Sequence, residues 1–137
     1  MKVLFVGLSN KPNVEPFDSS TNSGKVVDSI INKLECDCHK VNLVNYAPVN
    51  ENNKLRYPTT NEISAVIPEF MEFVTNLKPD LIVAFGNVVS NELQKIDMLN
   101  CKIIYHKHPS YILVFQRKNL ENYISKIVSE INCHNYN

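Results

Sequence analysis

The chain has 137 residues, which suit one domain over residues 1–137 with a self-supporting core. Its 14 basic and 14 acidic side chains cancel, which excludes an overall positive field, so any contact with nucleic acid must come from a local patch. No apolar run approaches the ~20 residues of a membrane span, and the first residues indicate a strand rather than a signal peptide, so we expect a cytoplasmic protein.

Short apolar runs alternate with longer amphipathic ones along the chain. The predicted elements are, in order, a strand over 3–6, a helix over 24–34, a strand over 41–44, a helix over 60–77, a strand over 81–85, a helix over 88–95, a strand over 102–105 and a helix over 120–131. The order βαβαβαβα implies right-handed crossovers. It predicts an α/β fold, a three-layer α/β/α sandwich around a four-stranded, mainly parallel sheet.

Helix boundaries are indicated by capping residues and prolines. Ser23 is expected to cap the first helix, Thr59 or Thr60 the second, and the segment 78–80 closes the second helix before the third strand. Pro68 lies inside the second helical pattern, so that helix either bends there or restarts at Pro68.

Polar segments follow each predicted strand, and the carboxyl ends of parallel strands are where α/β proteins bind ligands. They are residues 7–12, 42–50, 86–87 and 106–111, with a long loop over 46–58. We expect these segments to converge on one crevice. The first loop ends at a helix N-terminus that favours an anion such as phosphate, although the glycine spacing of a Walker loop is missing.

The cysteines lack the paired spacings of zinc ribbons and iron–sulfur sites, and cytosolic thiols are normally reduced. They are Cys36, Cys38, Cys101 and Cys133. The run Cys36-Asp37-Cys38-His39 with Cys133-His134 is a weak alternative that could hold a metal. We therefore expect no metal.

Four segments carry recognisable motifs in order over nearly the whole chain. They are Phe5-Val6-Gly7-Leu8-Ser9-Asn10 with Pro16-Phe17 and Ser23-Gly24-Lys25, Val41-Asn42-Leu43-Val44 with Pro48 and 58–63, Lys78-Pro79-Asp80 with the strand to Gly86, and His108-Pro109-Ser110-Tyr111. Together they resemble the uracil-DNA glycosylase superfamily, most nearly its family 4-like and mismatch-specific branches. The resemblance implies a monomeric enzyme that flips a base out of DNA and cleaves its N-glycosidic bond, without a cofactor.

Individual positions take roles from this resemblance. His108 matches the histidine that stabilises the departing base, Asn42 matches the amide that reads the base edge, and Phe17 matches the aromatic that stacks on the base. The alternatives are structural: His108 would be an ordinary turn residue, Asn42 a polar strand residue, and Phe17 an anchor of its loop on the core. Gly7 belongs to the first motif beside the substrate, and Ser110 matches a serine that contacts phosphate.

Further positions concern contact with DNA. Tyr111 opens a segment, 111–113, whose apolar side chains would fill the space left by the flipped base or would belong to a helix or the core. Ser23 and Lys25 would contact DNA at the first helix. Candidate phosphate contacts among the basic residues are Lys11, Lys25, Lys54, Arg56, Lys107, Arg117 and Lys118.

The first motif departs from the family at the position that orients the attacking water. Ser9 stands where relatives carry an acid or an asparagine, and Asn10 follows it, with Glu15 or Asp18 nearby. Neither Ser9 nor Asn10 is a strong base, but hydrolysis through a sugar cation needs a positioned water more than a strong base. The iron–sulfur cysteines of family 4 are not recognisable.

Three functions remain open at this point. The first is a glycosylase for uracil or a modified or mismatched pyrimidine, in base excision repair or in phage DNA processing, since the asparagine-rich composition suggests a phage or a low-GC bacterium. The second is a catalytically weak or inactive protein of the same fold that binds a base, a nucleotide or DNA. The third is an unrelated, flavodoxin-like nucleotide binder whose phosphate cradle is Ser23-Gly24-Lys25.

Overall fold

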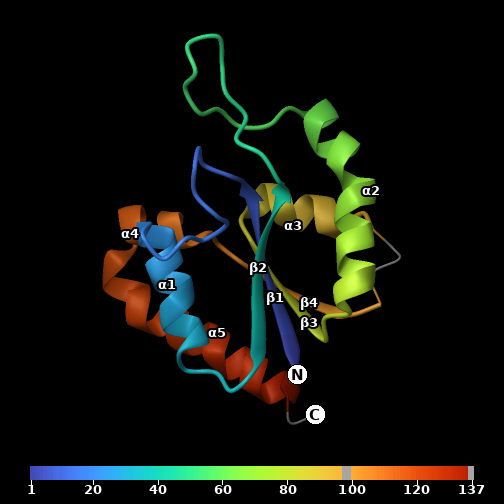
Figure 1. Cartoon of the computed structure of the whole chain (residues 1–137). Coiled ribbons are helices and arrows are strands. Elements are labelled where there is room, and N and C mark those ends of the chain that lie inside the picture. The colour runs from blue at the N-terminus through green and yellow to red at the C-terminus, as the bar shows by residue number, and fades with distance from the viewer. Residues whose placement is uncertain (97–99, 136–137) are drawn as a thin grey trace.

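Parallel strands form the central layer of the molecule (Figure 1). The structure is a computed structural model that describes residues 1–96 and 100–135. Within that part of the chain the strands are β1 (Lys2–Ser9), β2 (Asp37–Val44), β3 (Leu81–Phe85) and β4 (Lys102–His106). They pair in the order β2-β1-β3-β4, and every pair is parallel. The four-stranded parallel sheet predicted from the sequence is confirmed.

Burial on both faces of the sheet explains why the sequences of β1 and β3 are continuous apolar runs. Both occupy central positions in the sheet, and residues 3–6 and all of β3 are buried on both faces. The edge strands β2 and β4 are less buried, and β2 is buried only in its last third. The chain adds β2 on one side of β1 and then adds β3 and β4 on the other side. The carboxyl ends of β1 and β3 therefore form the topological switch point, where parallel sheets of this kind bind ligands.

Helices cover both faces of the sheet. The first face carries α1 (Asn22–Ile31), α4 (Pro109–Phe115) and α5 (Leu120–Asn135), whereas the second carries α2 (Thr60–Leu77) and α3 (Asn87–Gln94), as Figure 1 shows. A short 3₁₀ helix, Arg117–Asn119, joins α4 to α5. Each face has its own apolar cluster against the sheet, which confirms the three-layer α/β/α sandwich. Among the described helices, none is long and apolar enough to cross a membrane.

The start of α1 differs from the prediction. Thr21, not Ser23, is the N-cap, and its Oγ1 accepts a hydrogen bond of 3.0 Å from the Gly24 N–H. The loop fixes this choice, because the Thr21 N–H and hydroxyl both donate to the Asp18 carbonyl. A Cβ at position 24 would clash with that carbonyl, so the close approach requires glycine.

The bounds of α2 agree with the prediction. Thr59 caps it in a reciprocal box with Glu62, and Lys78, in the left-handed conformation at φ 54°, ends it. The helix runs through Pro68 as one element, so the alternative of a separate helix beginning there is wrong.

Helix α4 was not among the predicted elements. It has 7 residues, begins with Pro109 and is capped by His108. Its sequence is apolar on nearly every side, which gives no amphipathic period from which a helix could be predicted. The cap is the local reason that His108 sits at the end of β4 in a fixed geometry.

Candidate active site

A cavity of about 130 Å³ lies at the carboxyl edge of the sheet. Its lining comes from the loop after β1, the start of α1, the end of β2 and the start of α4, and consists of Ser9, Lys11, Val14, Glu15, Phe17, Asp18, Thr21, Ser23, Asn42, His108 and Ser110. Segments far apart in the sequence thus meet at one place, as the parallel topology predicts. A larger depression of about 490 Å³ between α1 and α5 contains none of the side chains at the strand ends, so we place the candidate site in the smaller cavity.

His108 presents one ring nitrogen to α4 and leaves the other for the cavity. Its Nδ1 accepts a hydrogen bond of 3.1 Å from the Ser110 backbone N–H and lies 2.8 Å from Ser110 Oγ. A backbone N–H can only donate, so Nδ1 carries a lone pair and the proton of the neutral ring lies on Nε2. Burial, and secondarily the positive charge of Lys11, lowers the pKa of His108 to about 4. Near pH 7 the ring is therefore a neutral donor.

Phe17 forms an aromatic wall of the cavity. Its ring stacks on the His108 ring at 5.7 Å between centroids and meets Phe85 edge-on at 5.4 Å. The residue is 8% exposed and belongs to the core cluster, so it anchors its loop as well as lining the cavity. The alternative of a loop anchor therefore agrees with the structure, and stacking of Phe17 on a base stays a prediction.

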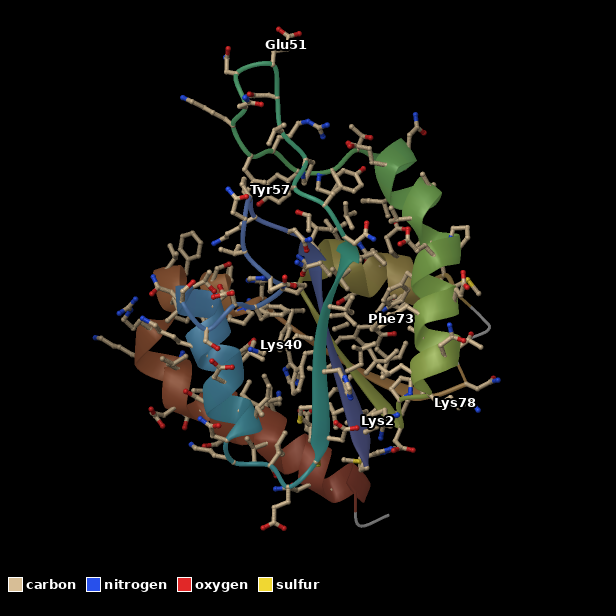
Figure 2. All side chains as sticks on the ribbon, viewed as in Figure 1. Lys2, Lys40, Glu51, Tyr57, Phe73 and Lys78 are labelled. Carbon is tan, nitrogen blue, oxygen red and sulfur yellow. The ribbon has the colours of Figure 1, made fainter. Side chains whose placement is uncertain are left out.

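A lysine on β2 holds the loop of Phe17 in place. Lys40 Nζ donates to the Phe17 carbonyl at 2.8 Å and to Asp28 Oδ1 at 2.7 Å, and Figure 2 shows Lys40 between β2 and α1. Phe17 has φ 49°, a left-handed conformation that is uncommon outside glycine. The charged hydrogen bond to its carbonyl helps to fix this conformation. Nothing in the sequence signalled this role of Lys40.

Asn42 is a buried polar residue, 7% exposed, near the end of β2. Its Nδ2 donates to Asn10 Oδ1 at 2.7 Å, and this is its one side-chain hydrogen bond within residues 1–96 and 100–135. Gly7 lies opposite, and a Cβ there would clash with Asn42 Oδ1 and would lie 2.8 Å from Phe17 Cζ. Glycine at this position therefore lets the amide and the aromatic ring approach each other across the cavity.

The two candidates for positioning water lie in different places. Ser9 lines the cavity. Asn10 is not among the lining residues; its Oδ1 accepts a hydrogen bond from Asn42, and its backbone N–H donates to the Tyr46 carbonyl. The carboxylates of Glu15 and Asp18 also line the cavity. Hydrogen bonds from Ser20 lower the pKa of Asp18, so this carboxylate is ionised at neutral pH.

Of the residues predicted to contact DNA, Ser23 lines the cavity within the first turn of α1, and Lys25, exposed on the same helix, does not. Tyr111 lies on α4 outside the cavity and is 38% exposed, with Lys107 Nζ 4.2 Å from its ring centroid. Ile112 is buried, so for this residue the alternative of a helix or core position agrees with the structure.

The exposed apolar surface of α4 instead continues toward its C-terminus. It consists of Tyr111, Val114 and Phe115, and the rings of Tyr111 and Phe115 lie 5.1 Å apart. The sequence prediction also missed Val14 and Thr21 as lining residues and treated Lys11 only as a phosphate contact. A loop without a regular period gives no signal for such lining positions.

Comparison with known proteins identifies the family. Residues 1–132 match the family model described as the uracil DNA glycosylase superfamily. The chain belongs to the uracil-DNA glycosylase superfamily. Members of this superfamily are hydrolytic glycosylases that act on DNA. The superfamily resemblance inferred from the motifs is confirmed, and the alternative of an unrelated flavodoxin-like binder is wrong.

The fold also agrees with a solved structure. The crystal structure of wild-type SMUG2 from Pedobacter heparinus matches with a TM-score of 0.74 and 14% sequence identity, over 99% of this chain and 76% of that one. At that identity the likeness concerns the fold. No curated protein matches the sequence.

Proposed function

We propose that this superfamily member is a DNA glycosylase that flips out uracil, or a modified or mismatched pyrimidine, and hydrolyses its N-glycosidic bond. The observation that carries the proposal is His108, a neutral imidazole whose Nε2–H is free to donate into a cavity shared with an amide and an aromatic ring. A small cavity of about 130 Å³ favours a single-ring base.

Phe17, Asn42 and His108 have different roles in base recognition and bond cleavage. Phe17 stacks on the base, and Asn42 offers an acceptor and a remaining N–H to its edge. As the glycosidic bond breaks, negative charge moves onto the base, and the Nε2–H of His108 donates to the carbonyl oxygen that receives it. A neutral donor suits this task, because it remains protonated on Nε2 throughout.

The sugar becomes cationic as the base leaves, and a water must then reach its C1′ atom. Ser9 and the carboxylates of Glu15 and Asp18 line the cavity and can orient that water and balance the positive charge. Asn10 acts through Asn42, whose amide it holds. Ser110 fixes the His108 ring, and with Ser23, Lys25 and Tyr111 it lies where the DNA backbone would pass.

The test is incubation with labelled single- and double-stranded oligonucleotides carrying uracil, hydroxymethyluracil, thymine opposite guanine, or hypoxanthine, followed by alkaline cleavage. Cleavage of a pyrimidine substrate by the wild-type protein, and its loss in His108→Ala and Asn42→Ala, is the expected result. His134→Ala is the matched control, since His134 lies in the last turn of α5 and does not line this cavity. If His108→Ala cleaves as fast as wild type, the proposed mechanism is wrong.

A second candidate function is base or DNA binding without chemistry. It is favoured by Ser9, which stands where the resemblance implies an acid or an asparagine that orients water. This alternative predicts that oligonucleotides bind, that Asn42→Ala weakens binding, and that no substrate yields abasic sites even with enzyme in excess. Titration by fluorescence anisotropy beside the cleavage assay separates the two functions.

A further inference from the structure

Lys11 is a cationic residue that has no role in the base excision proposed above for His108 and Asn42. It lies directly after Asn10, is exposed, and lines the cavity. Among the described residues its ammonium takes part in no hydrogen bond and no ion pair. It is close enough to His108 for its charge to act on that ring. An unpaired amine at the mouth of a catalytic cavity is free to react with what the cavity holds.

The arrangement of the lining places this amine beside the sugar rather than the base. Asn42 and Phe17 are buried and would enclose the base, so the sugar must lie toward the exposed part of the lining. That part contains Lys11 and Glu15. Removal of the base leaves an abasic sugar whose open form carries an aldehyde at C1′. A lysine amine and a carboxylate then face the two carbons, C1′ and C2′, at which strand cleavage begins.

We propose that Lys11 gives the protein a second activity, cleavage of the DNA strand at an abasic site through an imine between Lys11 Nζ and C1′. This inference builds on the proposed glycosylase, whose product is the substrate of the second step. Lys11 is then a catalytic residue of the lyase step, and the strand breaks on the 3′ side of the abasic sugar.

The proposed lyase reaction begins at the aldehyde of the abasic sugar. The neutral amine adds to the C1′ aldehyde, and the carbinolamine loses water to give a protonated imine. The Glu15 carboxylate removes a proton from C2′, the electron pair forms a C2′–C3′ double bond, and the bond from C3′ to the phosphate oxygen breaks with its electrons on the phosphate. Water then hydrolyses the imine and restores the lysine. No oxidant, metal or cofactor is consumed.

The test uses a synthetic oligonucleotide that carries an aldehydic abasic site, so that it does not depend on base excision by this protein. Sodium borohydride added during incubation reduces an imine to a stable amine, which a denaturing gel reveals as a protein–DNA adduct and peptide mass spectrometry assigns to a residue. We expect an adduct at Lys11. The tetrahydrofuran analogue, which has no aldehyde, should give none.

Variants separate the amine from its charge. Lys11→Arg keeps the positive charge but forms no imine, and both it and Lys11→Gln should lose the adduct and the strand cleavage. Lys33→Gln is the control, since Lys33 follows the far end of α1 and does not line this cavity. Circular dichroism verifies that each variant is folded.

Three outcomes overturn the proposal: no adduct with the wild-type protein, an adduct that persists in Lys11→Arg, or an adduct that maps to another lysine. The glycosylase assay with uracil-containing DNA is scored separately, with and without alkali. A protein that releases base but traps no abasic DNA refutes the lyase step alone. A protein that traps abasic DNA but releases no base refutes the proposed glycosylase and retains Lys11 as a lyase residue.

Discussion

The neutral state of His108 has a thermodynamic consequence that can be measured without any substrate. The folded protein lowers the pKa of this ring from an ordinary value of 6.5 to about 4. Below pH 6.5 the unfolded chain therefore binds a proton at this position more readily than the folded protein does. The contribution of His108 to stability is fully present above pH 6.5 and is lost as the pH falls from 6.5 toward 4.

These two pKa values give the size of the effect. Linkage between protonation and folding predicts that the free energy of unfolding is about 2 kcal/mol lower at pH 5 than at pH 7. Partial exposure of the ring reduces this difference to about 1–2 kcal/mol. The assay is urea unfolding of the wild-type protein and His108→Gln at pH 7 and pH 5, where Gln retains an acceptor for the Ser110 N–H. We expect the wild type to lose more stability than the variant over this interval, by the stated amount.

Other titrating groups are common to both proteins and cancel in the comparison. Equal losses in the two proteins would refute the lowered pKa of His108.

Three further predictions concern the walls and boundaries of the site. Gly7→Ala should destabilise the fold by ~1–3 kcal/mol, because its Cβ overlaps Asn42 and the Phe17 ring, and a thermal melt that equals wild type would contradict that packing. Lys40→Met should cost about 1–3 kcal/mol in urea unfolding, because it leaves the Phe17 carbonyl and a carboxylate of α1 without their donor, whereas an unchanged midpoint would show that the bonds contribute nothing. Thr59→Ala should lower the stability by ~1 kcal/mol through loss of the α2 cap, with Thr59→Ser as the conservative control that should retain most of it.

The sheet could be predicted because its signals are local. The continuous apolar run of β3 and the capped, amphipathic pattern of α2 each occur within one stretch of sequence, and their predicted bounds agree with the structure. The alternation of strands and helices then fixes the parallel order through the handedness of the crossovers. The meeting of Asn42 and His108 at one edge followed from that topology.

What could not be predicted depends on contacts between distant segments. Ser23 and Thr21 are equally good capping residues in sequence, and the turn at Asp18 decides between them. The hydrogen bond from Lys40 to the Phe17 carbonyl joins residues 23 apart along the chain, and no spacing rule anticipates it. Roles assigned to individual site residues remain predictions, because geometry places the groups without showing their chemistry.

The hydrogen bond between Asn10 and Asn42 has a consequence for base selection in the proposed glycosylase. An asparagine amide donates as readily as it accepts, so Asn10 can hold Asn42 in either of two orientations, with oxygen and nitrogen exchanged. Rotating both amides together would reverse the donor and acceptor that Asn42 presents, at no cost in paired groups. A carboxylate in place of Asn10 would accept only and would fix one orientation. The donor and acceptor that Asn42 presents in the proposed glycosylase are therefore exchangeable, whereas an aspartate at position 10 would fix them.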